Sequence, residues 1–146
     1  MNDTNSLNSI RITGPKETLI RLHDTIKDII SKQGSGGPRG LHFLLLALGY
    51  PEEDTRALDT REDFRPDFLS FMKVDTSLSD DVLAFGTLSD FDIKKDAWAA
   101  VRQTLPGIEI HYLSVTSSLG KIVTNDTEHR FFDISVRYHR DEDLSR

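Results

Sequence analysis

Regular alternation of apolar and polar residues in the C-terminal half constrains this fold more than any other feature. Residues 82–138 are predicted to form a strand, a helix and then strands at 108–115, 121–124 and 131–138. The last of these strands is the clearest, because its apolar side chains recur at every second position: Phe132, Ile134, Val136 and Tyr138. Alternation of this kind is typical of an antiparallel sheet with one packed face and one polar face.

The helix within this stretch has predicted start and stop signals. Ser89 is expected to cap its first turn, with Asp92 three residues later as a variant of the capping box. Pro106 and Gly107 are expected to end it. Its apolar stripe is formed by Ile93, Ala97, Trp98, Val101 and Leu105.

A strand and an amphipathic helix are predicted near the N-terminus. Ile10 and Ile12 flank Arg11 in the strand at residues 9–13, and Gly14 and Pro15 end it. Residues 16–33 then carry apolar side chains at helical spacing, which predicts a helix with one buried face.

The middle of the chain, residues 34–80, is predicted to be an irregular insertion. The glycine-rich residues 34–40 follow a helix and lack a Gly-Lys-Ser/Thr sequence, so we interpret them as a linker and not as a phosphate loop. Residues 41–48 are apolar and favour a short helix, and acidic residues 52–54 suit the first turn of another. Residues 66–74 fit either a helix or an edge strand.

Together these elements predict one α+β domain spanning residues 1–146. The expected architecture is a ferredoxin-like antiparallel sheet with helices packed on one face and additional C-terminal strands. Residues 141–146 are expected to form a frayed tail.

Part of the chain resembles the ferredoxin-like domain of the YubB-type proteins of plasmids and phages. The resemblance lies in residues 82–120, with Pro106, Tyr112 and Gly120, and in the strand that runs into Gly14 and Pro15. It covers about half of the chain. Residues 113–119 lack the acidic residue and glycine that the family places there, and the middle third does not match. The resemblance implies a mobile-element accessory protein and supplies no catalytic residues.

Composition and charge exclude several kinds of protein. The chain has no cysteine, which excludes disulfides, thiolate nucleophiles and Cys-based zinc sites. With 24 acidic and 18 basic residues its net charge is −6, which disfavours general binding to nucleic acid. The polar first eight residues do not resemble a signal peptide, and the longest apolar run is too short to span a bilayer. We therefore expect a cytoplasmic protein with no membrane partner.

The predicted strands make a carboxylate–imidazole cluster possible, although solvent-facing residues on a sheet are the simpler interpretation. Glu109 and His111 share one face of their strand, and His139 shares the polar face of the last strand with Asp133. If the two strands were neighbours, a hydrolase centred on Glu109, His111 and Asp133 would be possible. The histidines show no metal-binding spacing, and we predict no metal and no cofactor.

Our leading hypothesis is a non-enzymatic binding protein that acts through protein–protein contact. It would be an accessory or inhibitor protein of a phage or plasmid, and an anti-defence role is one form of this hypothesis. The predicted contact residues lie on the polar strand face, with residues 34–65 as a second surface: Phe131, Arg137, His139, Glu109 and His111. Because Phe131 is an aromatic on that face, a module for single-stranded nucleic acid is an alternative.

Overall fold

The strands form one antiparallel sheet in the order β2-β3-β1-β4-β5. This computed structural model describes residues 5–33, 39–73, 81–128 and 130–132. Within them the strands are β1 (Asn5–Thr13), β2 (Glu62–Lys73), β3 (Asp81–Asp90), β4 (Glu109–Thr116) and β5 (Lys121–Thr124). The helices are α1 (Lys16–Ile30), α2 (Gly40–Ala47), α3 (Glu52–Arg56) and α4 (Lys95–Thr104), and a short 3-10 helix spans Ser117–Leu119. The prediction of an α+β fold with an antiparallel sheet is confirmed.

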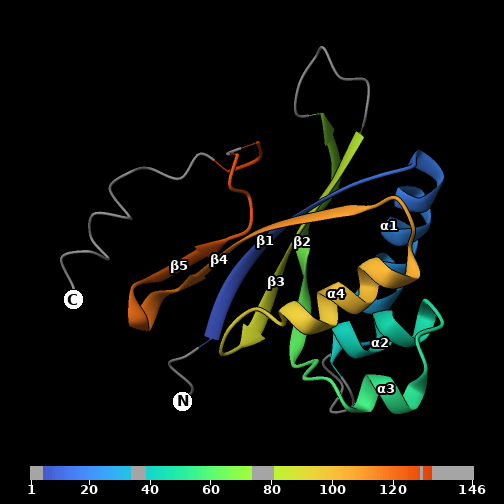
Figure 1. Ribbon diagram of the computed structural model, residues 1–146, viewed down its shortest axis with the longest axis horizontal. Helices are drawn as coiled ribbons and strands as arrows, with labels where there is room; N and C mark the ends of the chain where they lie inside the picture. The colour runs from blue at the N-terminus through green and yellow to red at the C-terminus, as the bar shows by residue number, and fades with distance from the viewer. Residues whose placement is uncertain (1–4, 34–38, 74–80, 129, 133–146) are drawn as a thin grey trace.

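One face of the sheet packs against the helices and forms the core. Ile10 lies opposite Phe85 and Tyr112 in the ladders, so side chains at these positions share a face. Trp98 of α4 packs against Phe85 at a ring-centroid distance of 5.9 Å. Figure 1 shows the helices gathered at one side of the sheet while the β4–β5 hairpin extends away from them. This confirms the prediction that the helices cover one face.

The predicted irregular insertion contains two helices and a strand within its described part. Helix α2 buries Leu41, Leu44 and Leu45 completely, because its apolar residues complete the core beside α1. Strand β2 pairs with β3 along the edge of the sheet. A register shift between Arg65 and Ser70 interrupts this pairing. The bulge also interrupts the apolar alternation, which explains why residues 66–74 fitted a helix as well as the edge strand that the structure shows up to Lys73.

The predicted cap of the second long helix is wrong. Helix α4 begins at Lys95, and Ser89 belongs to β3, where its hydroxyl donates a hydrogen bond to the carbonyl of Phe91. The side chain of Glu62 on β2 takes the capping role by accepting the backbone N–H of Lys94 at 3.0 Å. A residue far away in the sequence therefore caps this helix, which a local motif cannot predict.

The strand predicted at residues 131–138 is described only at its first two positions. Phe131 and Phe132 are placed, and neither belongs to a strand. Residues 133–138 and the predicted tail at 141–146 lie outside the described residues. Among the helices that are described, none has the length and apolar character needed to cross a membrane.

Candidate binding face

The face of the sheet opposite the helices carries the candidate site, and we call it the open face. The ladders place Ser9 of β1 beside Gly86 of β3, and Arg11 beside Ala84. On the other side of β1, Arg11 lies opposite His111 of β4. Since neighbouring side chains in a ladder point to the same face, these residues form one continuous surface.

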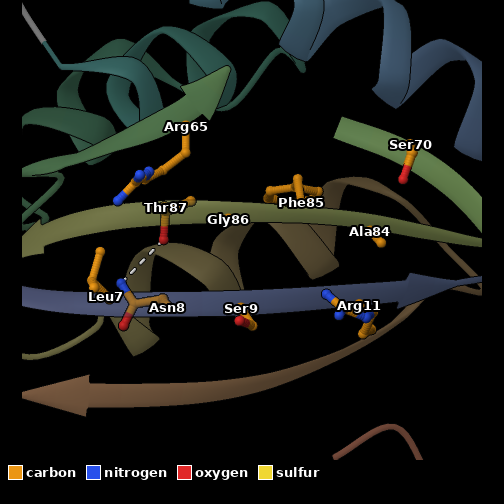
Figure 2. Close-up of a pocket in the computed structure, with 10 residues that line it drawn as sticks. All are labelled: Leu7, Asn8, Ser9, Arg11, Arg65, Ser70, Ala84, Phe85, Gly86 and Thr87. Carbon is orange, nitrogen blue, oxygen red and sulfur yellow. Dashed lines mark hydrogen bonds between the residues drawn. The ribbon is translucent and has the colours of Figure 1, made fainter. Parts of the chain in front are cut away.

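A groove of about 520 Å³ runs along the open face between β2 and β1. Its floor is low because Ala84 and Gly86 have small side chains or none. Arg65 lies on the β2 side and Arg11 on the β1 side, as Figure 2 shows. The bulge of β2 begins at Arg65, and bulges often occur beside functional sites. The volume is within the range typical of ligand sites in proteins.

Arg11 is a half-buried cation at the end of this groove. Its guanidinium donates a hydrogen bond to the carbonyl of Ile10 at 3.0 Å and lies 5.3 Å from the ring centroid of Phe132. Burial lowers the pKa of Arg11 below its ordinary value. No carboxylate of the described chain forms an ion pair with Arg11, so burial of this charge is not compensated by an acid.

An aromatic cluster adjoins Arg11 on β4 and the segment that follows β5. The rings of His111 and Phe131 lie 4.8 Å apart, and the guanidinium of Arg130 lies 4.9 Å from the Phe131 ring centroid. Asp126 orders this segment by accepting the backbone N–H groups of residues 130, 131 and 132 at 2.8–3.0 Å. Burial alone would raise the pKa of Asp126, but these three donors outweigh burial and lower it. The carboxylate therefore holds Phe131 and Phe132 against the open face.

The structure brings together two of the five predicted binding residues. His111 and Phe131 are in contact, and Glu109 is exposed two positions before His111 on the same strand. Arg137 and His139 lie outside the described residues. Sequence reasoning missed Arg11 and Arg65 as site residues, although the flanking Ile10 and Ile12 already indicated that Arg11 points away from the core.

The carboxylate–imidazole cluster is not formed within the described residues. His111 Nδ1 is buried and has no hydrogen-bond partner there, and Asp133 lies outside. A search of the described side chains finds no group of three or more histidines, aspartates or glutamates that could hold a metal ion. The contact of the His111 ring with Phe131 resembles a packed surface more than a proton-transfer site.

A buried carboxylate on the helix-covered face is the main polar feature that the sequence did not reveal. Glu62 is fully buried and accepts hydrogen bonds from Thr87 Oγ1 and Trp98 Nε1, each at 2.7 Å, in addition to the Lys94 N–H. Asn8 extends this network by donating to Thr87 Oγ1 at 3.1 Å. Burial raises the pKa of Glu62 despite these donors. Every contact of this carboxylate joins β2 to β3 or α4, which indicates a structural role.

Most of the charged side chains that line a second hollow, at the start of α4, form ion pairs. The volume of this hollow is about 550 Å³. Asp59 pairs with Arg61 at 2.9 Å and with the buried Lys94 at 3.0 Å, and these contacts lower the pKa of Asp59. Asp92 pairs with Lys121 at 3.2 Å. Because these charges already have partners, the hollow offers less to a charged ligand than the groove does.

Side-chain amides occupy backbone groups at both margins of the sheet. Gln33 hydrogen-bonds to the N–H and the carbonyl of Phe64 on β2. Asn125 accepts the N–H of Tyr112 at 2.8 Å and donates to the carbonyl of Ile110 at 2.8 Å on β4. At these positions the amides take the place of a further strand, so an added chain cannot pair there. The open face is therefore a better candidate for partner contact than these parts of the edges.

Comparison with known proteins adds no relative. No family model matches the chain, and no curated protein or solved structure matches it significantly.

Proposed function

We propose that this chain is a non-enzymatic binding protein that contacts a protein partner through the open face. The observation that carries the proposal is Arg11, a half-buried guanidinium that lines a groove without a carboxylate partner among the described residues. Burying a charge without an opposite charge is costly, and such residues are often kept for binding. The contact between His111 and Phe131 extends the same surface with an aromatic group of the kind enriched at interfaces.

The proposal includes a ferredoxin-like core for the fold. Along the chain the elements β1, α1, β2, β3, α4 and β4 follow one another, and in space the four strands have the order β4-β1-β3-β2. This connectivity of two β-α-β units in an antiparallel sheet supports a ferredoxin-like assignment. Helices α2 and α3 would then be an insertion before β2, and β5 an additional strand.

An accessory or inhibitor role in a phage or plasmid is the biological form of this proposal. Its support is the resemblance of residues 82–120 to the YubB-type domain, which implies a mobile-element protein. An inhibitor needs a surface complementary to its target and no catalytic centre, and the open face offers such a surface. An anti-defence role is a specific case of the same proposal.

Single-stranded nucleic acid is the second candidate ligand for this face. The guanidinium of Arg130 stacks on Phe131, and Arg11 lies over Phe132. Nucleobases can stack on arginine–aromatic pairs of this kind. The net charge of −6 opposes a phosphate backbone, because cation release supplies most of the affinity of such proteins. This balance favours the protein partner.

Site-specific photo-cross-linking in cells that naturally carry the gene tests the proposal. A photoreactive residue at Ser9, which lines the groove, should yield covalent adducts with a cellular protein. The matched control is Gln103, which is exposed on α4 at the opposite side of the molecule and should yield none. Adding Arg11→Glu or Phe131→Ala to the Ser9 variant should reduce the adducts, because both changes alter the open face.

Two outcomes would contradict the proposal. If the Gln103 variant forms adducts and the Ser9 variant forms none, the partner contacts the helices and not the open face. Adducts from Ser9 that contain nucleic acid instead of protein would favour the second candidate.

A further inference from the structure

We infer that the groove on the open face recognises an acidic, partly apolar segment of the partner protein, with a carboxylate held by Arg11. This inference rests on the proposed function and names the chemistry of the partner. It assigns a ligand class to a site that so far has only a location.

The hydrogen-bonding capacity of Arg11 is largely unused within the described chain. A guanidinium has five N–H donors, and the described contacts of Arg11 use one of them, for the carbonyl of Ile10. The ring of Phe132 supports the flat group but accepts no conventional hydrogen bond. A carboxylate is the partner whose two oxygens match the guanidinium fork best.

Arg39 is a comparable partly buried arginine that has a structural role and two carboxylate partners. Its side chain is 31% exposed, and it pairs with Asp63 at 2.6 Å and with Asp90 at 3.3 Å. With 24 acidic residues available, the chain supplies carboxylates where a guanidinium must be held in place. Among the described residues this contrast supports a carboxylate of the partner as the ligand of Arg11.

The dimensions of the groove suit an extended segment. Arg65 lies opposite Gly86, while Arg11 lies opposite Ala84 on the other side of β3. Two strand spacings across the sheet and two residues along it separate their Cα atoms by about 12 Å. Acidic side chains two to four positions apart on an extended peptide could therefore meet both arginines.

The expectation that the segment contains an apolar residue rests on Leu7. Leu7 lines the groove and is 47% exposed, and the ladders place Leu88 and Val115 beside it on the same face. A purely charged ligand would leave this surface unused, whereas an apolar side chain at the Leu7 end of the groove would cover it. Because every second side chain of an extended segment points to the same side, we expect its acidic and apolar residues an even number of positions apart.

A peptide titration followed by amide NMR shifts tests the inference on the full chain. The probe is a short acetylated peptide in which glutamate and leucine occupy every second position and serine the positions between them. The control is the same peptide with glutamine in place of glutamate. The glutamate peptide should shift the amides of Ser9, Ala84 and Gly86, and the glutamine peptide should not. Arg11→Gln should weaken binding by roughly tenfold or more. Arg56→Gln should leave binding unchanged, because Arg56 pairs with Glu52 on the distant α3.

Three results would overturn the inference. One is equal binding of both peptides by the wild-type chain, a comparison that remains valid if Arg11→Gln does not fold. Another is unchanged affinity of a folded Arg11→Gln. The third is tighter binding of oligo(dT) than of the glutamate peptide at the same salt concentration, which would assign the face to nucleic acid. If the glutamate peptide does not bind while the Ser9 variant still cross-links to a protein, the ligand class is wrong but the proposed function is not contradicted.

Discussion

The two faces of this sheet differ in the number of hydrogen-bond partners that a buried ionisable side chain has. On the helix-covered face, Glu62 has three hydrogen-bond donors, and each of them links two secondary-structure elements. On the open face, Arg11 is half-buried, and its partners among the described residues are one backbone acceptor and an aromatic ring. A buried ion with a complete set of partners contributes to a unique packing, whereas one without them lowers stability unless a ligand supplies them. The comparison separates a structural charge from a functional one.

Loss of the Glu62 carboxylate should have the largest effect on the free energy of unfolding. Glu62→Ala leaves the indole N–H of Trp98 and the hydroxyl of Thr87 without their acceptor and removes the cap of α4. We expect a loss of about 3–5 kcal/mol, measured by urea unfolding. Glu109→Ala, which changes an exposed glutamate on the same sheet, is the control and should stay within about 0.5 kcal/mol. A loss below about 1 kcal/mol for Glu62→Ala would contradict a structural role.

The pH dependence of stability should show a smaller effect of the same group. Burial raises the pKa of Glu62 above its ordinary value of 4.5, and the donors Lys94, Thr87 and Trp98 offset this only in part. Between these two pKa values the folded chain binds more protons than the unfolded chain, so the free energy of unfolding falls as pH rises. The slope due to one group cannot exceed about 1.4 kcal/mol per pH unit.

Comparison with Glu62→Gln isolates this contribution, since the other titrating groups remain in the variant. Asp59 and Asp126 have lowered pKa values, so the stability they contribute is present above their ordinary pKa and is lost as pH falls. The stability of the wild type relative to Glu62→Gln should therefore decline from about pH 4.5 upward and then level off. A difference that rises with pH over this range would show that the carboxylate is preferred in the folded state.

Much of the architecture could be predicted from local patterns, because strands and helices with one buried face carry the period of their structure. The helix at residues 16–33, the strand around Ile10 and Ile12, and the short strand at 121–124 are confirmed as α1, β1 and β5. For residues 66–74 the pattern left a helix and an edge strand open, and the strand is the alternative found in β2. The bulge after Arg65 shifts the register of β2 and obscured its start at Glu62. The predicted cap of α4 was wrong because Glu62, which lies on a strand distant in sequence, caps this helix.

The candidate site was predicted in part, for a related reason. The prediction placed Phe131 and His111 on polar strand faces; their rings are in contact, although Phe131 does not belong to a strand. The groove depends on the pairing of three strands that are distant in sequence, so Arg11 and Arg65 could not be associated from spacing alone. Arg11 is identified by its burial and by the lack of a carboxylate partner among the described residues, and neither property is visible in a sequence.

The most direct test of this account is the free energy of unfolding of Arg11→Met, with Arg39→Met as the matched control. Methionine replaces the cation–π contact with a thioether beside the Phe132 ring and removes a charge that has no acidic partner among the described residues, so we expect Arg11→Met to lie within about 1 kcal/mol of the wild type or to be more stable. Arg39→Met should lose about 1–3 kcal/mol, because Asp63 and Asp90 are left without their cation. A loss of more than about 2 kcal/mol for Arg11→Met would make Arg11 a structural residue and contradict the central claim.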